Sequence, residues 1–136
     1  MGVVVLIVDD DERNARLARD VLERSGLRTI TATTAEAGIA EARARQPDVV
    51  LMDLRLPDLD GAAAARQLAD DPATAAIPVV ALTAIRSGEW PAESAFAGYL
   101  EKPIDVRSFP RDVRRHCRGQ PPPDRDAGPL DGEAGR

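Results

Sequence analysis

Two uninterrupted apolar runs dominate the pattern of hydrophobic and polar positions along this chain of 136 residues. The first covers residues 3–8, and the second, residues 49–52, leads directly into Asp53 and then a Pro- and Gly-containing loop. Runs of this length without polar alternation predict strands that are buried on both faces of a sheet. Three further strands are predicted at residues 28–33, 77–82 and 98–101, the first of them rich in Thr and Ile.

Segments with helical spacing separate these strands. We predict helices at residues 13–25, 35–45 and 62–70, where Gly26 ends the first and a capping box of Thr33 and Glu36 opens the second. Helical spacing places five apolar residues in one stripe of the first helix: Ala15, Leu17, Ala18, Val21 and Leu22.

The region after residue 85 is less regular. Gly88, Trp90 and Pro91 disfavour helix, so only a short helix near residues 92–96 is expected. A last helix is predicted around residues 106–117, and Pro110 inside it implies either a late start with Ser108 as the cap or a kink. Residues 119–136 are rich in Pro, Gly and Asp, and we expect this tail to be disordered.

This alternation of strands and helices predicts one α/β domain at residues 1–118, with a doubly wound, five-stranded parallel sheet of strand order 2-1-3-4-5. In open parallel sheets, ligands bind beyond the carboxyl ends of the strands, where strand order reverses. The residues that follow strands one, three, four and five are Asp9 and Asp10, Asp53, Thr83, and Lys102. The topology therefore predicts one cleft that contains three carboxylates, a hydroxyl and an ammonium.

The composition of the chain limits its possible binding partners and its cellular location. The net charge of −5 argues against non-specific binding of nucleic acid, and no nucleic-acid partner is expected. The apolar run at residues 2–8 is too short to cross a bilayer and lacks the features of a signal peptide. Cys117 is the one cysteine, so no internal disulfide can form, and we expect a cytoplasmic protein without a membrane partner. Lys102 is the one lysine among 18 basic residues, which indicates a site that accepts only a compact charge.

The predicted cluster has a specific chemistry. Carboxylates about 4 Å apart repel by several kcal/mol at the effective dielectric of a partly buried site. Oxygen ligands without His or Cys suit Mg²⁺, which shares its coordination shell with phosphate oxygens. A carboxylate can act as a nucleophile and form an acyl phosphate, while an ammonium and a hydroxyl bind phosphoryl oxygens. The sequence therefore supports phosphoryl transfer onto an aspartate.

From about residue 3 to residue 118 the chain resembles the two-component response-regulator receiver domains of the CheY-like, flavodoxin-like fold. Five signals in order carry the resemblance: Val8-Asp9-Asp10, Leu51-Met52-Asp53 with Leu56-Pro57, Asp60-Gly61, Leu82-Thr83-Ala84, and Gly98-Tyr99-Leu100-Glu101-Lys102-Pro103. The resemblance implies a stand-alone or excised receiver that is not an enzyme, apart from catalysing its own phosphorylation and dephosphorylation. It also implies a histidine kinase or phosphotransfer protein as phosphate donor and a downstream protein partner of unknown identity.

The resemblance also implies roles for individual residues. Asp53 is the expected phosphoacceptor, Asp10 and Asp53 the direct Mg²⁺ ligands, Asp9 a ligand acting mainly through water, and Arg55 the donor of a backbone carbonyl. Three residues are expected to bind the phosphoryl group: Thr83, Ala84 and Lys102. Thr83 and Tyr99 are the expected switch pair, and the Lys102–Pro103 peptide bond is expected to be cis.

The chain departs from the family pattern in one region and leaves other interpretations open. The segment from Thr83 to Lys102 is two or three residues shorter than the resemblance implies, which affects the usual fourth-helix output surface. One alternative is a receiver-fold interaction module that is never phosphorylated. Another is a haloacid-dehalogenase-type phosphatase, with Asp9 as nucleophile and Asp11 as acid. The arginines of the last helix form either a solvated face or a docking patch for an acidic partner: Arg107, Arg111, Arg114, Arg115 and Arg118.

Overall fold

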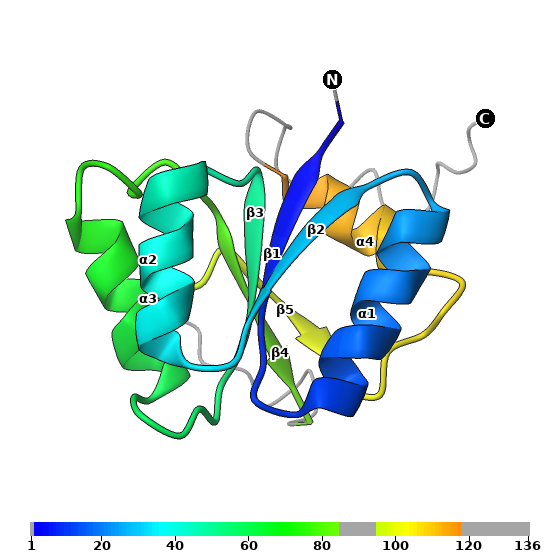
Figure 1. Ribbon diagram of the computed structural model, residues 1–136, viewed down its shortest axis with the longest axis horizontal. Coiled ribbons are helices and arrows are strands. Elements are labelled where there is room, and N and C mark those ends of the chain that lie inside the picture. The colour runs from blue at the N-terminus through cyan, green and yellow to red at the C-terminus, as the bar shows by residue number, and fades with distance from the viewer. Residues whose placement is uncertain (1, 85–94, 118–136) are drawn as a thin grey trace, which may run out of the picture.

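The computed structural model describes residues 2–84 and 95–117 (Figure 1). Within these ranges it contains five strands and four helices. The strands are β1 (Val4–Val8), β2 (Arg28–Ala32), β3 (Val49–Asp53), β4 (Val79–Thr83) and β5 (Gly98–Glu101). The helices are α1 (Glu12–Arg24), α2 (Ala35–Arg45), α3 (Gly61–Asp70) and α4 (Phe109–Arg115).

The five strands form one parallel sheet in the order β2-β1-β3-β4-β5, which confirms the predicted topology. Helices α1 and α4 cover one face of the sheet, and α2 and α3 cover the other (Figure 1). The order of strands reverses between β1 and β3, so the carboxyl ends of these two strands flank the point where ligands bind in such sheets.

Alternate residues of the central strands build two separate cores. Val5, Ile7 and Leu51 point to the α1 and α4 side, whereas Leu6 and Met52 point to the α2 and α3 side. All five are fully buried. Because complete burial of such a side chain contributes about 1.5–3 kcal/mol, these strands form a rigid base for the residues at their carboxyl ends.

Small residues allow α2 to lie close to the sheet. Ala35 and Ala42 are fully buried, and a Cβ atom built on Gly38 would lie 2.6 Å from Cγ2 of Val8. No larger residue fits at position 38 without displacing the β1 side chain.

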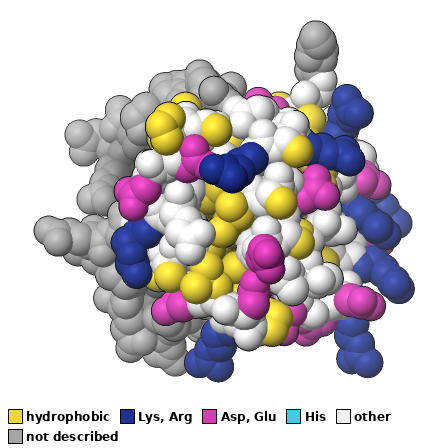
Figure 2. All heavy atoms as spheres, turned by 60° about the vertical axis from the view of Figure 1, so that its left-hand side comes forward, with side chains coloured by type: hydrophobic (Ala, Val, Ile, Leu, Met, Phe, Trp, Pro, Cys, Tyr) yellow, Lys and Arg dark blue, Asp and Glu magenta, His cyan; other side chains and the backbone are white. Residues whose placement is uncertain are grey.

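From the α2 and α3 side, hydrophobic side chains reach the surface in a band between charged ones (Figure 2).

The helix starts follow the rules of N-terminal capping, with one correction. Asp11 caps α1 by accepting hydrogen bonds from the backbone N–H groups of Arg13 (2.9 Å) and Asn14 (3.4 Å). The predicted capping box of Thr33 and Glu36 is wrong. The N-cap of α2 is Thr34, whose hydroxyl accepts from the N–H of Ala37, so Glu36 does not occupy the N3 position that the box requires.

Two further predictions need adjustment, and a third, which had left two alternatives open, is decided. Leu17 is 42% exposed and lies outside the core, because the other four residues of its stripe already fill the face of α1 that contacts the sheet. Strand β4 is shifted along the chain and ends at Thr83, so this residue belongs to the strand itself. Helix α4 starts late, at Phe109, which confirms one of the two alternatives. Ser108 is its N-cap residue, but the side chain makes no capping hydrogen bond.

The short helix expected at residues 92–96 lies mostly outside the described residues, and so does the tail at 119–136. Over the ranges that the structure describes, no helix is long and apolar enough to span a membrane.

Candidate functional site

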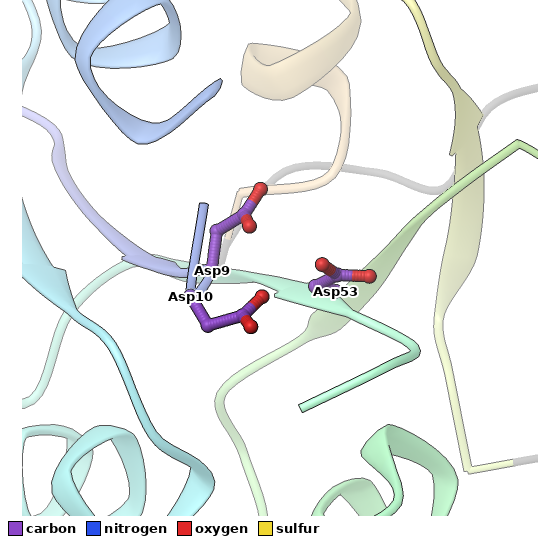
Figure 3. Close-up of side chains that lie close together, drawn as sticks. All are labelled: Asp9, Asp10 and Asp53. Carbon is purple, nitrogen blue, oxygen red and sulfur yellow. The ribbon is translucent and has the colours of Figure 1, made fainter. Parts of the chain in front are cut away.

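Three carboxylates meet at the edge of the sheet where β1 and β3 end (Figure 3). Val8 pairs with Met52 in the parallel register, so Asp9 and Asp53, each one residue further along, emerge side by side. One oxygen from each of Asp9, Asp10 and Asp53 lies within 4.8 Å of the others. Asp9 and Asp53 are buried and Asp10 is exposed, so the cluster is open to solvent on one side. The proximity predicted from topology is thereby confirmed.

Lys102 reaches this cluster from the end of β5. Its Nζ atom lies 3.2 Å from Oδ2 of Asp53 and 3.5 Å from Oδ2 of Asp9. The backbone N–H of Lys102 donates a 2.8 Å hydrogen bond to the carbonyl of Thr83, which fixes the start of the side chain. The Lys102–Pro103 peptide bond is cis, as expected. One ammonium therefore contacts two of the three carboxylates.

The two buried carboxylates are held by the backbone that follows them. Oδ1 of Asp9 accepts a hydrogen bond from the N–H of Asp11 (2.9 Å), and Oδ1 of Asp53 accepts one from the N–H of Arg55 (3.1 Å). The second oxygen of Asp9, Oδ2, is buried and accepts no hydrogen bond. Burial raises the pKa of the Asp9 carboxyl, partly offset by the Asp11 hydrogen bond and the Lys102 charge. The site thus contains a buried oxygen that lacks a full set of partners.

A pocket of about 400 Å³ opens over this cluster. Among the predicted phosphoryl-binding residues it brings together Thr83, Ala84 and Lys102, and Asp10, Asp53 and Arg55 also line it. Asp9 is not among the lining residues, and only 1% of its surface is exposed. An incoming group therefore has direct access to Asp53 and Asp10.

The loop after Asp53 is closed by local contacts. Arg55 and Asp60 form an antiparallel bridge, and the N–H of Gly61 donates to the carbonyl of Leu54 (3.0 Å). A Cβ atom on Gly61 would lie 2.5 Å from the backbone oxygen of Asp53, so only glycine permits this approach. The Asp60-Gly61 motif, singled out in the sequence, therefore holds the backbone of the Asp53 loop in place.

The structure places the predicted switch pair on neighbouring strands. Thr83 is 4% exposed and pairs with Glu101, whereas Tyr99 pairs with Ala81. The Tyr99 ring is half-buried, and its centroid lies 5.5 Å from that of Phe96, at a tilt of 58°. Tyr99 thus lies two residues before the position on β5 that pairs with Thr83, a residue that lines the pocket.

Some residues of the site were not predicted from the sequence. Asp11, Asn14 and Leu54 also line the pocket. Asn14 lies in the first turn of α1, shortly after Asp9 and Asp10, and its place at the start of this helix would have indicated its position. Asp58 lies in the loop after Asp53 and binds the N-terminus of α2, a contact with no local sequence signal.

The donor set fits a hard divalent cation. All three candidate side chains offer carboxylate oxygens, and the buried Oδ2 of Asp9 has no hydrogen-bond donor to satisfy it. Asp10 is exposed, so its carboxylate is accessible to an ion that keeps part of its water shell. Oxygen ligands with retained water are what Mg²⁺ prefers in proteins. The residues at the β1 and β3 ends are therefore suited to hold Mg²⁺.

Fold and site together define a parallel α/β protein with an acidic, lysine-containing pocket at its strand ends. The family described as the response regulator receiver domain matches residues 5–114. The polar-differentiation response regulator DivK of Brucella ovis is 35% identical over 115 residues, which cover 82% of this chain and 94% of that protein. The chain therefore belongs to the response regulator receiver domain family of two-component systems.

Solved structures support the same assignment. A sensor protein from Polaromonas sp. JS666 is 30% identical with a TM-score of 0.77, over 84% of this chain and 94% of that one. The receiver domain of sensor histidine kinase PA1611 from Pseudomonas aeruginosa, solved with magnesium in its active-site cleft, is 28% identical with a TM-score of 0.75, covering 85% and 98%. The chemotaxis response regulator CheY4 of Vibrio cholerae shares the fold, with a TM-score of 0.78, 23% identity and coverage of 85% and 98%.

Proposed function

We propose that Asp53 accepts a phosphoryl group from a histidine kinase or a phosphotransfer protein. The observation that carries this proposal is the contact between Nζ of Lys102 and Oδ2 of Asp53, 3.2 Å, at an open pocket. The contact places an ammonium beside the attacking carboxylate, where phosphoryl oxygens arrive. Asp9, Asp10, Asp53 and the backbone carbonyl of Arg55 would hold Mg²⁺, and the family and the magnesium bound by the PA1611 receiver support this choice of metal.

The reaction uses few groups. A carboxylate oxygen of Asp53 attacks phosphorus, the bond from phosphorus to the donor nitrogen breaks, and that nitrogen keeps the electron pair. The product is an acyl phosphate on Asp53. Lys102, the hydroxyl of Thr83 and the N–H of Ala84 are the pocket groups that can bind the three phosphoryl oxygens. When bound, Mg²⁺ would offset the negative charge of the carboxylates and orient the phosphoryl group.

Two alternatives are less well supported by the geometry. A phosphatase with Asp9 as nucleophile needs an accessible Asp9, but this residue is 1% exposed and does not line the pocket. A module that is never phosphorylated has no use for a lysine held between two buried carboxylates. We therefore propose a cytoplasmic signalling receiver that modifies only itself and passes its state to a protein partner through Thr83 and Tyr99.

The test is incubation with acetyl phosphate and Mg²⁺, followed by intact-mass spectrometry. We expect the mass of one phosphoryl group to be added and to be lost on treatment with hydroxylamine, which cleaves acyl phosphates. Asp53→Asn should abolish the addition, while Asp70→Asn, on the exposed end of α3, serves as the matched control. Addition of an acid-stable phosphate to Asp53→Asn at the wild-type level would overturn the proposal.

A further inference from the structure

A second pocket, of about 490 Å³, lies far from the acidic cluster, between the end of α1 and helix α4. We call it the arginine pocket. Of the described residues, four arginines and three others line it: Arg107, Arg111, Arg114, Arg115, Ser25, Val106 and Pro110. Four cations thus face one cavity in a chain whose net charge is −5. None of these residues lines the acidic pocket described above.

Only one of the arginines has a clear structural role. Nη2 of Arg114 donates a 2.6 Å hydrogen bond to the carbonyl of Ser25, the residue that ends α1. Arg111 approaches Asp112 at 3.7 Å, in an exposed pair of little energetic value. Among the described residues, no carboxylate lies within ion-pair distance of Arg107 or Arg115. Two guanidinium groups therefore have their charge available for a ligand.

Helix electrostatics do not account for the cluster. Arg114 and Arg115 lie in the last turn of α4, where a cation is favourable. Arg107 precedes the N-cap Ser108, where a cation is unfavourable. Arg111 and Arg115 are four residues apart, a spacing at which like charges destabilise a helix. The stability of helix α4 thus gives no reason for the presence of Arg107 and Arg111.

The pocket also has an apolar side. Val106 is 56% exposed, and among the described residues Leu17 is the other large hydrophobic side chain at the surface. Pro110 adds further apolar surface to the lining. Arginine is enriched in protein–protein interfaces relative to the rest of the surface. Among the residues that the structure describes, no aromatic side chain lines the pocket, so these residues offer no ring on which a base can stack.

We propose that the arginine pocket is a docking site for an acidic segment of a partner protein, in which carboxylates meet Arg107, Arg111 and Arg115 and an aliphatic residue contacts Val106. The charge complementarity of four cations with an acidic ligand supports this occupant. Arg114 also holds the pocket to the end of α1 through Ser25.

Because the arginine pocket is remote from Asp53, a partner bound there leaves Asp53 accessible. Asp11 and Asn14, at the N-terminal end of α1, line the acidic pocket, whereas Ser25 lies at the other end. Because α1 has 13 residues, these ends are about 20 Å apart. Docking at the arginine pocket and phosphorylation of Asp53 therefore use separate surfaces, and their tests can fail independently.

The experiment measures binding of a short fluorescent peptide of Glu, Leu and Ala to the full chain by anisotropy, with amide NMR shifts to locate it. A peptide with Lys in place of Glu is the charge control. We expect the acidic peptide alone to bind, with shifts at Ser25 and residues 106–115. Arg107→Gln with Arg115→Gln should weaken binding about tenfold, and Arg107→Lys with Arg115→Lys should retain most of it because the charge is kept.

The matched control is Arg45→Gln with Arg66→Gln, which removes the same charge from the α2 and α3 side. This pair should change binding by less than about twofold. Both Gln pairs should be phosphorylated by acetyl phosphate at the wild-type rate. Equal weakening by the control pair, equal binding of the Lys peptide, or absence of binding would overturn the proposal. Tighter binding at this pocket of inorganic phosphate, a dinucleotide or a second copy of the chain would overturn it too.

Discussion

The carboxylate of Asp58 accepts hydrogen bonds from the first two backbone N–H groups of α2, those of Ala35 (2.9 Å) and Glu36 (3.0 Å). These donors have no partner within their own helix. Asp58 belongs to the loop that begins directly after Asp53, so the contact connects the phosphoacceptor loop to a helix 22 and 23 residues away. The hydrogen bonds from Ala35 and Glu36 lower the pKa of the Asp58 carboxyl.

Asp58→Ala should lower the urea midpoint of unfolding at pH 7, since two N–H groups lose their acceptor and the Asp53 loop loses an anchor. An aspartate whose folded-state pKa is lowered contributes stability that is present above the unfolded pKa of about 4 and is lost as pH falls through the lower folded value. The difference between wild type and variant should therefore shrink at acid pH. Asp70→Ala, at an exposed helix end, is the control. Equal midpoints for wild type and Asp58→Ala at pH 7 would contradict the capping role.

The contact between Asp58 and the N-terminus of α2 also shows which features cannot be predicted from the sequence. The strand ending at Asp53 was predictable because its signals are local: a continuous apolar run, then Pro57 and the Asp60-Gly61 turn. The cap of α2 was not predictable. Thr33 and Thr34 both fit the N-cap preference, and the second acceptor, Asp58, comes from another part of the chain.

The site itself was largely predictable from topology. Once the strand order is known, the residues at the carboxyl ends of β1, β3, β4 and β5 must lie at one edge, and Asp9, Asp53 and Lys102 do so. The burial of Asp9 and the lack of a hydrogen bond to its Oδ2 atom were not predictable, because they depend on how side chains pack around this residue. For the same reason the sequence did not reveal that Leu17 lies at the surface.

Lys102→Arg should fold normally and yet slow phosphorylation by acetyl phosphate by about tenfold or more. Nζ of Lys102 lies within 3.5 Å of both Asp9 and Asp53, in a side chain that is 20% exposed, and a wider guanidinium does not fit as a point charge there. The rate can be followed by intact mass. Arg45→Lys, the reverse exchange on the exposed face of α2, should leave the rate unchanged. A wild-type rate for Lys102→Arg would show that the shape of the cation does not matter.

Asp10→Asn should raise the stability of the metal-free protein and reduce its response to Mg²⁺. It removes one of three carboxylates whose oxygens lie within 4.8 Å of one another. Because Asp10 is exposed, water screens its repulsion, and we expect a gain of about 0.5–1 kcal/mol. Thermal melts with and without millimolar Mg²⁺ measure both effects, and Asp20→Asn on the outer face of α1 is the control.

In wild type, Mg²⁺ should raise the melting midpoint far more than it does in Asp10→Asn. The reason is that the ion relieves repulsion that the variant no longer has, and the variant has lost one ligand. A lower metal-free midpoint for Asp10→Asn, or equal responses of the two proteins to Mg²⁺, would mean that this cluster is not the metal site.

His116 should make stability depend on pH near neutrality. It follows α4 and packs against the backbone of β5, where a Cβ atom on Gly98 would lie 2.5 Å from its Cε1. Burial lowers the pKa of the His116 imidazole, although Asp112 opposes the shift and Arg115 adds to it. The unfolded chain therefore binds a proton first as pH falls below about 6.5, and the stability contributed by neutral His116 declines until the folded pKa is passed.

His116 is the one histidine of the chain, so its imidazole proton signals in NMR are assigned without ambiguity. We expect a titration midpoint below 6.5 in the folded protein. Urea midpoints at pH 7.5 and 5.5 should differ more for wild type than for His116→Gln, because other groups titrate alike in both proteins. A folded-state midpoint at or above 6.5, or equal pH dependence of the two proteins, would show that the packing of His116 on Gly98 does not favour the neutral ring.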